Sequence, residues 1–130
     1  IAAPTYQFTD LGTLGGNHIK SAAFAINDRG QVVGKSIINN SQSRAFIYDT
    51  TNGMQNLGTL GGSSSEAIDI NNNGQIVGSS RNSNNATHAF IYDASNGMKD
   101  IGTLGGQYSI ARAINDKGQV VGNSVNQCWK

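Results

Sequence analysis

The stretch Leu11-Gly12-Thr13-Leu14-Gly15-Gly16 occurs three times in this chain and decides how the rest of the sequence is interpreted. The second copy spans 57–62 with the same six residues, and the third spans 101–106 with Ile in place of the first Leu. The copies begin 46 and then 44 residues apart. Self-similarity at a period of about 20 to 50 residues indicates propeller blades, solenoid coils or another repeat array.

Two further blocks return at a constant step of 44 residues and extend the repeat beyond the hexapeptide. The first follows the pattern Ile-Asn-x-x-Gly-Gln-(Val/Ile)-Val-Gly and begins at Ile26, Ile70 and Ile114. The second is Ala-Phe-Ile-Tyr-Asp, at 45–49 and 89–93. The longer first interval places two extra residues around 17–20, which we interpret as a loop insertion.

The length of 130 residues predicts a single β-repeat domain over 1–130 with one real core. We expect repeat units at about 17–62, 63–106 and 107–130, the last of them partial. Residues 1–16 correspond to the end of a unit, so they are expected to act as a closing strand. On this reading the chain starts and stops inside a repeat unit.

Each unit is predicted to contain four short strands, which in the first unit span 23–27, 31–36, 44–49 and 54–60. Between the first two strands, Asn27-Asp28-Arg29-Gly30 predicts a tight turn, because Asn and Asp bond the local backbone and Gly adopts positive φ freely. Equivalent turns are expected at Asn72-Asn73 and Asp116-Lys117. No segment shows an apolar period of 3.6 residues, so helices are not expected.

Consecutive apolar residues such as Val32-Val33 and Phe46-Ile47-Tyr48 indicate strands that are buried on both faces, which in antiparallel hairpins requires sheets stacked on either side. A β-propeller of four-stranded blades provides this arrangement. The predicted fold is therefore all-β, with propeller-like four-stranded blades in a partial propeller or in stacked antiparallel sheets. A β-solenoid is the alternative architecture. The residues predicted to be buried are Val33, Val77, Phe46 and Phe90.

The small residues Gly34, Gly78 and Gly122 occupy one repeated position. Two explanations fit them equally. They could allow neighbouring sheets to approach closely near an axis, or they could mark a bulge or bend in a twisted strand.

Composition excludes several classes of partner. The net charge is +1, and lysines and arginines are scattered singly, so a nucleic-acid partner is not expected. No apolar run is long enough for a membrane span, and Ile1-Ala2-Ala3-Pro4 is too short for a signal peptide, although it could be the end left after one was removed. The single cysteine, Cys128, forms no internal disulfide and is either an inert thiol or an intermolecular link.

The motif His88-Ala89-Phe90, the hexapeptide and the Ile-Asn-x-x-Gly-Gln hairpin together resemble the HAF family of extracellular repeats, which is named for its His-Ala-Phe motif. The resemblance covers nearly all of 6–124. It implies an exported bacterial or archaeal repeat module, and it carries no activity or ligand to individual residues. Arg44 stands where the second unit has His88, which argues against a chemical role for that histidine.

No catalytic residue, cofactor or metal site is predicted. The chain has two histidines, His18 and His88, and neither lies in a hydrolase or zinc motif. Asp49 and Asp93 are equivalent strand-end residues, better explained as turn starters than as paired catalytic carboxylates. The Asn-Asp-x-Gly turns have too few oxygen ligands for a calcium loop.

Sugar recognition is the binding function that the residue types allow, with a cell-surface or extracellular glycan as the partner. The candidate contacts, which serve equally well as packing anchors, are Tyr48, Asp49, Tyr92, Asp93 and Trp129. Asn39 and Asn85 begin Asn-x-Ser/Thr triplets in equivalent loops and could accept a glycan.

The leading hypothesis is a secreted, non-enzymatic structural or adhesive module that self-associates head-to-tail into a filament or ring. Its expected assembly edge is the segment 6–16, which should complete a sheet in a neighbouring chain or in the last unit of the same chain. The residues of that edge are Tyr6, Phe8, Leu11 and Leu14. The alternative is a lectin-like protein whose chains together close a propeller, with glycans between the blades.

Overall fold

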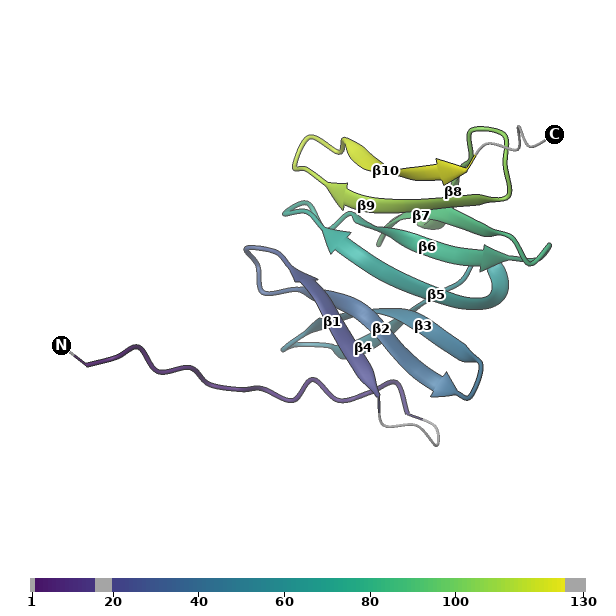
Figure 1. Ribbon diagram of the computed structural model, residues 1–130. Coiled ribbons are helices and arrows are strands. Elements are labelled where there is room, and N and C mark those ends of the chain that lie inside the picture. The colour runs from purple at the N-terminus through teal and green to yellow at the C-terminus, as the bar shows by residue number, and fades with distance from the viewer. Residues whose placement is uncertain (1, 16–19, 126–130) are drawn as a thin grey trace.

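The computed structural model describes residues 2–15 and 20–125, and within that part of the chain all regular structure is β-strand (Figure 1). The all-β prediction is therefore confirmed. The strands are β1 (Ser21–Ile26), β2 (Val32–Asn39), β3 (Gln42–Asp49), β4 (Gly53–Gly58), β5 (Gly61–Ile70), β6 (Ile76–Asn82), β7 (Thr87–Asp93), β8 (Gly97–Gly102), β9 (Tyr108–Ile114) and β10 (Val120–Val125).

The strands form three units that follow the sequence repeat. Unit 1 is the antiparallel meander β1 to β4, unit 2 is the equivalent meander β5 to β8, and unit 3 is the hairpin β9–β10. Equivalent residues pair in the same way, because Tyr48 faces Met54 in unit 1 and Tyr92 faces Met98 in unit 2. A single parallel pair, Thr87 with Tyr108, joins unit 3 to the sheet of unit 2.

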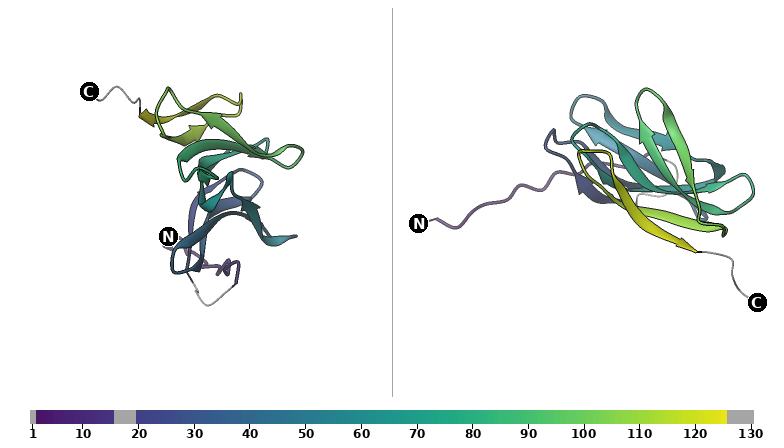
Figure 2. Two further views of the ribbon diagram at one scale, coloured as in Figure 1. Left: turned by 90° about the vertical axis from the view of Figure 1, so that its right-hand side faces the viewer. Right: turned by 90° about the horizontal axis from the view of Figure 1, so that it is seen from above.

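The units are stacked in chain order, with unit 1 at one end of the molecule and unit 3 at the other (Figures 1 and 2). Between units 1 and 2, Val33 and Ala45 belong to one apolar cluster with Ala67 and Ile70. Between units 2 and 3, the equivalent residues form a second cluster, which contains Val77, Ala89, Ala111 and Ile114. The four residues predicted to be buried, Val33, Phe46, Val77 and Phe90, are all fully buried.

The turn after each first strand forms as the sequence predicts. In unit 1 the Gly30 N–H donates to the Asn27 carbonyl at 3.1 Å, and the Asn27 N–H donates to the Gln31 carbonyl at 3.1 Å. The same two bonds occur at Asn71 and at Asn115. Gly30 has a φ of 75°, a left-handed conformation that glycine adopts without strain.

The repeated glycines Gly34, Gly78 and Gly122 lie against a carbonyl of their own hairpin. A Cβ at Gly78 would collide with the backbone oxygen of Glu66, and the other two glycines face the equivalent carbonyls. The strand register shifts at the same level in each hairpin, as in a β-bulge. The bulge explanation therefore accounts for these glycines, because the closest contact of each lies within its own hairpin.

Replacing Gly78 by Ala should lower the free energy of unfolding by about 1 to 3 kcal/mol, because the added methyl group meets backbone that cannot move aside without distorting the bulge. Urea denaturation of the purified variant measures the change. Lys99→Ala, on the exposed side of β8, is the control and should change stability by less than about 0.5 kcal/mol. Equal midpoints for both variants would contradict this account of the glycines.

Candidate functional site

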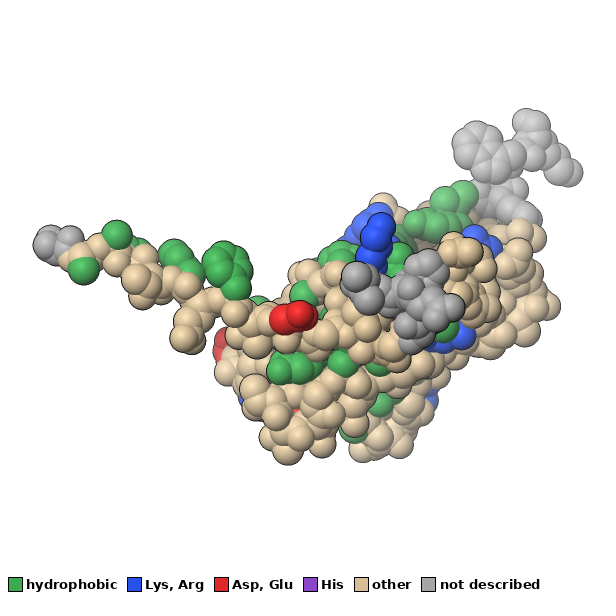
Figure 3. Space-filling view, turned by 90° about the horizontal axis from the view of Figure 1, so that it is seen from below, with side chains coloured by type: hydrophobic (Ala, Val, Ile, Leu, Met, Phe, Trp, Pro, Cys, Tyr) green, Lys and Arg blue, Asp and Glu red, His purple; other side chains and the backbone are tan. Residues whose placement is uncertain are grey.

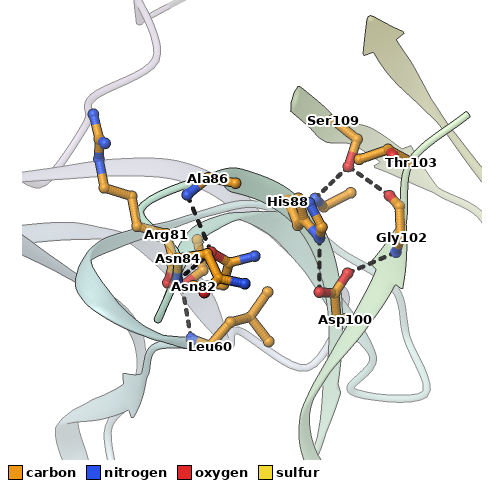
Figure 4. Close-up of polar contacts among 12 residues, drawn as sticks. Leu60, Arg81, Asn82, Asn84, Ala86, His88, Asp100, Gly102, Thr103 and Ser109 are labelled. Carbon is orange, nitrogen blue, oxygen red and sulfur yellow. Dashed lines mark hydrogen bonds and ion pairs between the residues drawn. The ribbon is translucent and has the colours of Figure 1, made fainter. Parts of the chain in front are cut away.

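A contact between His88 and Asp100 resembles part of a hydrolytic site (Figure 4). His88, on β7, places Nδ1 2.7 Å from Oδ2 of Asp100 on the neighbouring β8. The other oxygen of Asp100 accepts a hydrogen bond from the Gly102 backbone at 2.6 Å. A carboxylate that orients an imidazole is two thirds of a catalytic triad.

Ser109 lies near this pair, but its hydroxyl group is already bonded on both sides (Figure 4). It donates to the Gly102 carbonyl at 2.6 Å and accepts the Ala89 N–H at 2.8 Å. Ser65 makes the equivalent bonds at the junction of units 1 and 2. We conclude that these serines are structural links between successive units, and that no Ser or Thr hydroxyl in the described part of the chain is hydrogen-bonded to His88.

Three of the five residues suggested for glycan contact lie together in a groove between units 1 and 2. Asp49, Tyr92 and Asp93 line this groove, whose volume is about 740 Å³. Arg29, Asn52 and Gln55 add polar groups to the same lining. Tyr48 is not part of it, and Trp129 lies outside the described residues, as do Cys128 and His18.

Asp49 and Asp93 also organise the turns that follow their strands, as the sequence predicts. Oδ1 of Asp49 accepts the N–H groups of Thr51 and Asn52 at 2.9 and 2.7 Å. The Asn52 backbone N–H, followed by its side-chain amide, lowers the pKa of Asp49 below its ordinary value. For Asp93, the side-chain amide of Asn96 and then its backbone N–H lower the pKa in the same way.

These lowered pKa values predict how stability depends on pH. Each aspartate stabilises the fold fully above the unfolded pKa of about 3.9, and the contribution is lost as the pH falls through the lower folded pKa. In thermal melts between pH 7 and 2, the melting temperature of the parent should therefore exceed that of the Asp49→Ala/Asp93→Ala double variant by a constant margin near neutrality. The margin should shrink below about pH 3.9. A margin that persists to pH 2 would contradict the turn role.

The first asparagine of each Asn-x-x-Gly turn directs its side-chain oxygen at backbone N–H groups. Oδ1 of Asn27 accepts from Arg29 and Gln31 at 3.1 and 3.0 Å, and Asn71 accepts equivalently from Asn73 and Gln75. In the residues that the structure describes, no three His, Cys, Asp or Glu side chains gather as metal ligands.

The side-chain amides of the same asparagines form a hydrogen-bond ladder from unit to unit. Nδ2 of Asn27 donates to the Asn71 carbonyl, and Nδ2 of Asn71 donates to the Asn115 carbonyl, both at 3.0 Å. We call this the asparagine ladder. Sequence analysis missed it, because local turn chemistry already explained these positions. One signal in the sequence could have revealed it: the first residue of the turn is Asn in all three copies, although Asp or Ser would also form such a turn.

A second row of bonds runs beside the ladder, through the next residue of each turn. The backbone N–H of Asp28 donates to Oδ1 of Asn72, and the N–H of Asn72 donates to Oδ1 of Asp116, both at 2.8 Å. Nδ2 of Asn72 donates to both flanking carboxylates at 3.0 Å. The middle amide thus separates two negative charges.

Exposed large apolar side chains gather at the two ends of the described chain, and none lies between Val32 and Asn96. Those near the start are Tyr6, Phe8, Phe24 and Ile26, and those near the end are Ile101, Leu104, Tyr108, Val121 and Val125. A patch of exposed apolar residues is a common sign of an interaction surface.

The four residues of the predicted assembly edge fall into two groups, one packed against unit 1 and one exposed to solvent. The Leu14 N–H donates to Ser36 Oγ at 3.0 Å, as Leu60 donates to Ser80 in the next unit. Leu11 and Leu14 are half-buried, whereas Tyr6 is exposed and Phe8 is completely exposed on a segment that projects from the body (Figure 3).

Residues 2–15 form no strand. In the described chain this segment therefore pairs with no strand of unit 3. Its partner in the repeat pattern would be a third strand of the preceding unit, and unit 3 ends in the described chain at its second strand. That the segment completes a sheet, in a neighbouring chain or in the last unit, stays a prediction.

Comparison with known proteins identifies one relationship. The family described as "Protein of unknown function (DUF3466)" matches residues 7–104, which include units 1 and 2 and part of the segment before them. No curated protein and no solved structure matches the chain. No helix in the described residues is long and apolar enough to cross a membrane.

Proposed function

We propose that this chain, which belongs to the DUF3466 family of proteins of unknown function, is a non-enzymatic extracellular repeat module with a structural or adhesive role. In this proposal it self-associates head-to-tail, and its stacked units act as blades of a propeller-like arrangement. The resemblance to HAF repeats is what supports the proposed location and export.

One observation supports self-association above the others: each end of the stack exposes a position whose equivalents are buried at the junctions between units. Ile26 of unit 1 is 67% exposed, whereas its equivalents Ile70 and Ile114 are buried. Val121 of unit 3 is 63% exposed, whereas Val33 and Val77 are fully buried. A surface that is core elsewhere in the same molecule gains stability when another unit covers it.

A non-enzymatic role is supported by the chemistry of the side chains. The His88–Asp100 pair has no equivalent in unit 1, where Arg44 and Asn56 occupy the two positions. The neighbouring serines hold units together, and the aspartates at the strand ends hold turns together. Each of these groups has a structural partner that accounts for it.

Sedimentation velocity over a wide range of protein concentration tests the proposal. We expect species larger than one chain, whose proportion grows with concentration, and electron microscopy would distinguish rings from filaments. A shortened chain that begins at Asp10 keeps the contacts of Gly12 and Leu14 with unit 1 and loses Tyr6 and Phe8. Weaker assembly of this shortened chain would support the exposed segment as part of the edge. A full-length chain that stays monomeric throughout would contradict self-association.

The groove between units 1 and 2 favours a second candidate, a lectin-like protein that binds glycans. Its lining combines one aromatic face, Tyr92, with carboxylates and amides, which suit sugar rings and hydroxyl groups. Glycan-array binding with a defined stoichiometry, abolished in Arg29→Ala or Gln55→Ala while the fold persists, would support this function. Both side chains are exposed in the groove, so their loss should not unfold the protein.

A further inference from the structure

We infer that the contact between two copies reproduces the contact between successive units, so that β10 of one copy receives β1 of another copy. The inference rests on the proposed self-association and specifies its interface and partner. The partner is a second copy of this chain, because the interface continues one that the molecule already contains twice.

The apolar part of this interface is defined by repeat equivalence. Val33 of unit 1 lies in one cluster with Ala67 and Ile70 of unit 2, and Val77 of unit 2 lies in one cluster with Ala111 and Ile114 of unit 3. Each time, the second strand of one unit meets the first strand of the next.

The same positions remain uncovered at the two ends. Val121 is exposed on β10, and Ala23 and Ile26 are exposed on β1. Val121 also lines a groove of about 250 Å³ together with Ile101 and Leu104. Suppose that unit 1 of a second copy follows unit 3 in the way that each unit follows the preceding one within the chain. Its Ile26 then lies beside Val121, as Ile70 lies in one cluster with Val33.

The polar part of the interface is an open asparagine ladder. Nδ2 of Asn27 and Nδ2 of Asn71 each donate to the glutamine of their own turn and to the next unit. Nδ2 of Asn115 donates only to Gln119 within the described residues.

At the opposite end of the ladder, a carbonyl has room for one more donor. In the described chain the Asn27 carbonyl accepts the Gly30 N–H and no side-chain amide, whereas the Asn71 and Asn115 carbonyls each also accept one from the preceding unit. The same placement of a second copy that joins Val121 to Ile26 joins the Asn115 amide to the Asn27 carbonyl.

The charges of the turns predict what weakens this contact. Within the chain the amide of Asn72 bonds the carboxylates on both sides, Asp28 and Asp116. Between copies, Asp116 would meet Asp28 without an amide between them, and Lys117 and Arg29 would meet in the adjacent row. Like charges at close range repel, so Asp116→Asn should strengthen self-association several-fold. Asparagine already occupies the equivalent position, Asn72, and the substituted side chain keeps an oxygen for the Asn72 backbone N–H, while the bond from Asn72 Nδ2 is given up.

The contact uses two different faces, and mixing two variants therefore tests it. Val121→Arg disables the β10 face, and Ile26→Arg disables the β1 face. Each variant alone should be monomeric by sedimentation velocity. An equimolar mixture should form a dimer of one copy of each and nothing larger, because one intact face of each kind remains. Thermal melts confirm that both variants fold, which their exposed positions allow.

Val125→Arg is the matched control. Val125 is exposed on the same strand, and its equivalent in unit 2 is Arg81, also exposed. An arginine fits this position, so Val125→Arg should assemble like the parent.

The outcomes separate the interface from the proposed function. If Val121→Arg and Ile26→Arg assemble as the parent does, this interface is wrong and self-association stands. If each variant is monomeric and their mixture is monomeric as well, the two faces do not bind each other and the inference is overturned. A parent that is monomeric at every concentration overturns both.

Discussion

Phe46→Ala and Phe90→Ala should each lower the free energy of unfolding by about 3 to 5 kcal/mol. Both rings are fully buried, and each lies opposite a glycine of the neighbouring strand, Gly34 and Gly78 respectively. Removal of either ring loses apolar burial and leaves a cavity in a domain whose total stability is on the order of 5 to 15 kcal/mol. Guanidinium or urea denaturation followed by circular dichroism measures both variants.

Phe8→Ala is the matched control, because Phe8 is completely exposed. Its free energy of unfolding should lie within about 0.5 kcal/mol of the parent value. Changes below about 1 kcal/mol for both Phe46→Ala and Phe90→Ala would contradict the stacked-sheet structure.

Asn71→Ala should lower the free energy of unfolding by about 2 to 4 kcal/mol, at roughly 1 kcal/mol for each hydrogen bond lost. The buried Asn71 side chain makes four such bonds: it accepts from Asn73 and Gln75, and it donates to Gln75 and to the Asn115 carbonyl. The loss affects both the turn of unit 2 and its attachment to unit 3.

Asn115→Ala provides the comparison for Asn71→Ala. Asn115 is exposed and makes the same bonds within its turn, but its side chain donates to no further unit in the described chain. Its backbone carbonyl, which accepts from Asn71, is unchanged by the substitution. We therefore expect a smaller loss for Asn115→Ala, on the order of 1 to 2 kcal/mol. Equal losses would show that the asparagine ladder contributes nothing between units.

The strands and turns could be predicted from the sequence because their causes are local. Alternating and consecutive apolar residues mark strands. The turn is specified by Asn27 and Gly30, which are only three positions apart in the sequence. The role of Gly34 could not be decided in this way. A small residue is required wherever backbone comes close, whether that backbone belongs to the same hairpin or to a neighbouring sheet.

The candidate glycan residues were only partly brought together for a similar reason. Asp49 and Asp93 are equivalent, and both reach the groove between units 1 and 2 from the ends of their strands. Of the equivalent pair Tyr48 and Tyr92, only Tyr92 lines it. Tyr92 also packs against the cluster between the units. The asparagine ladder was equally hidden, because it joins residues 44 positions apart.

The asparagine ladder has a consequence for how such chains change length. Its acceptors are backbone carbonyls, which are present whatever side chain a neighbouring unit carries at that position. A block of 44 residues can therefore be duplicated or lost as a whole while each remaining junction keeps its bond of the asparagine ladder. Stability in such an array grows roughly by one unit and one junction at a time, so a change in the number of repeats alters stability without altering how the remaining units are joined.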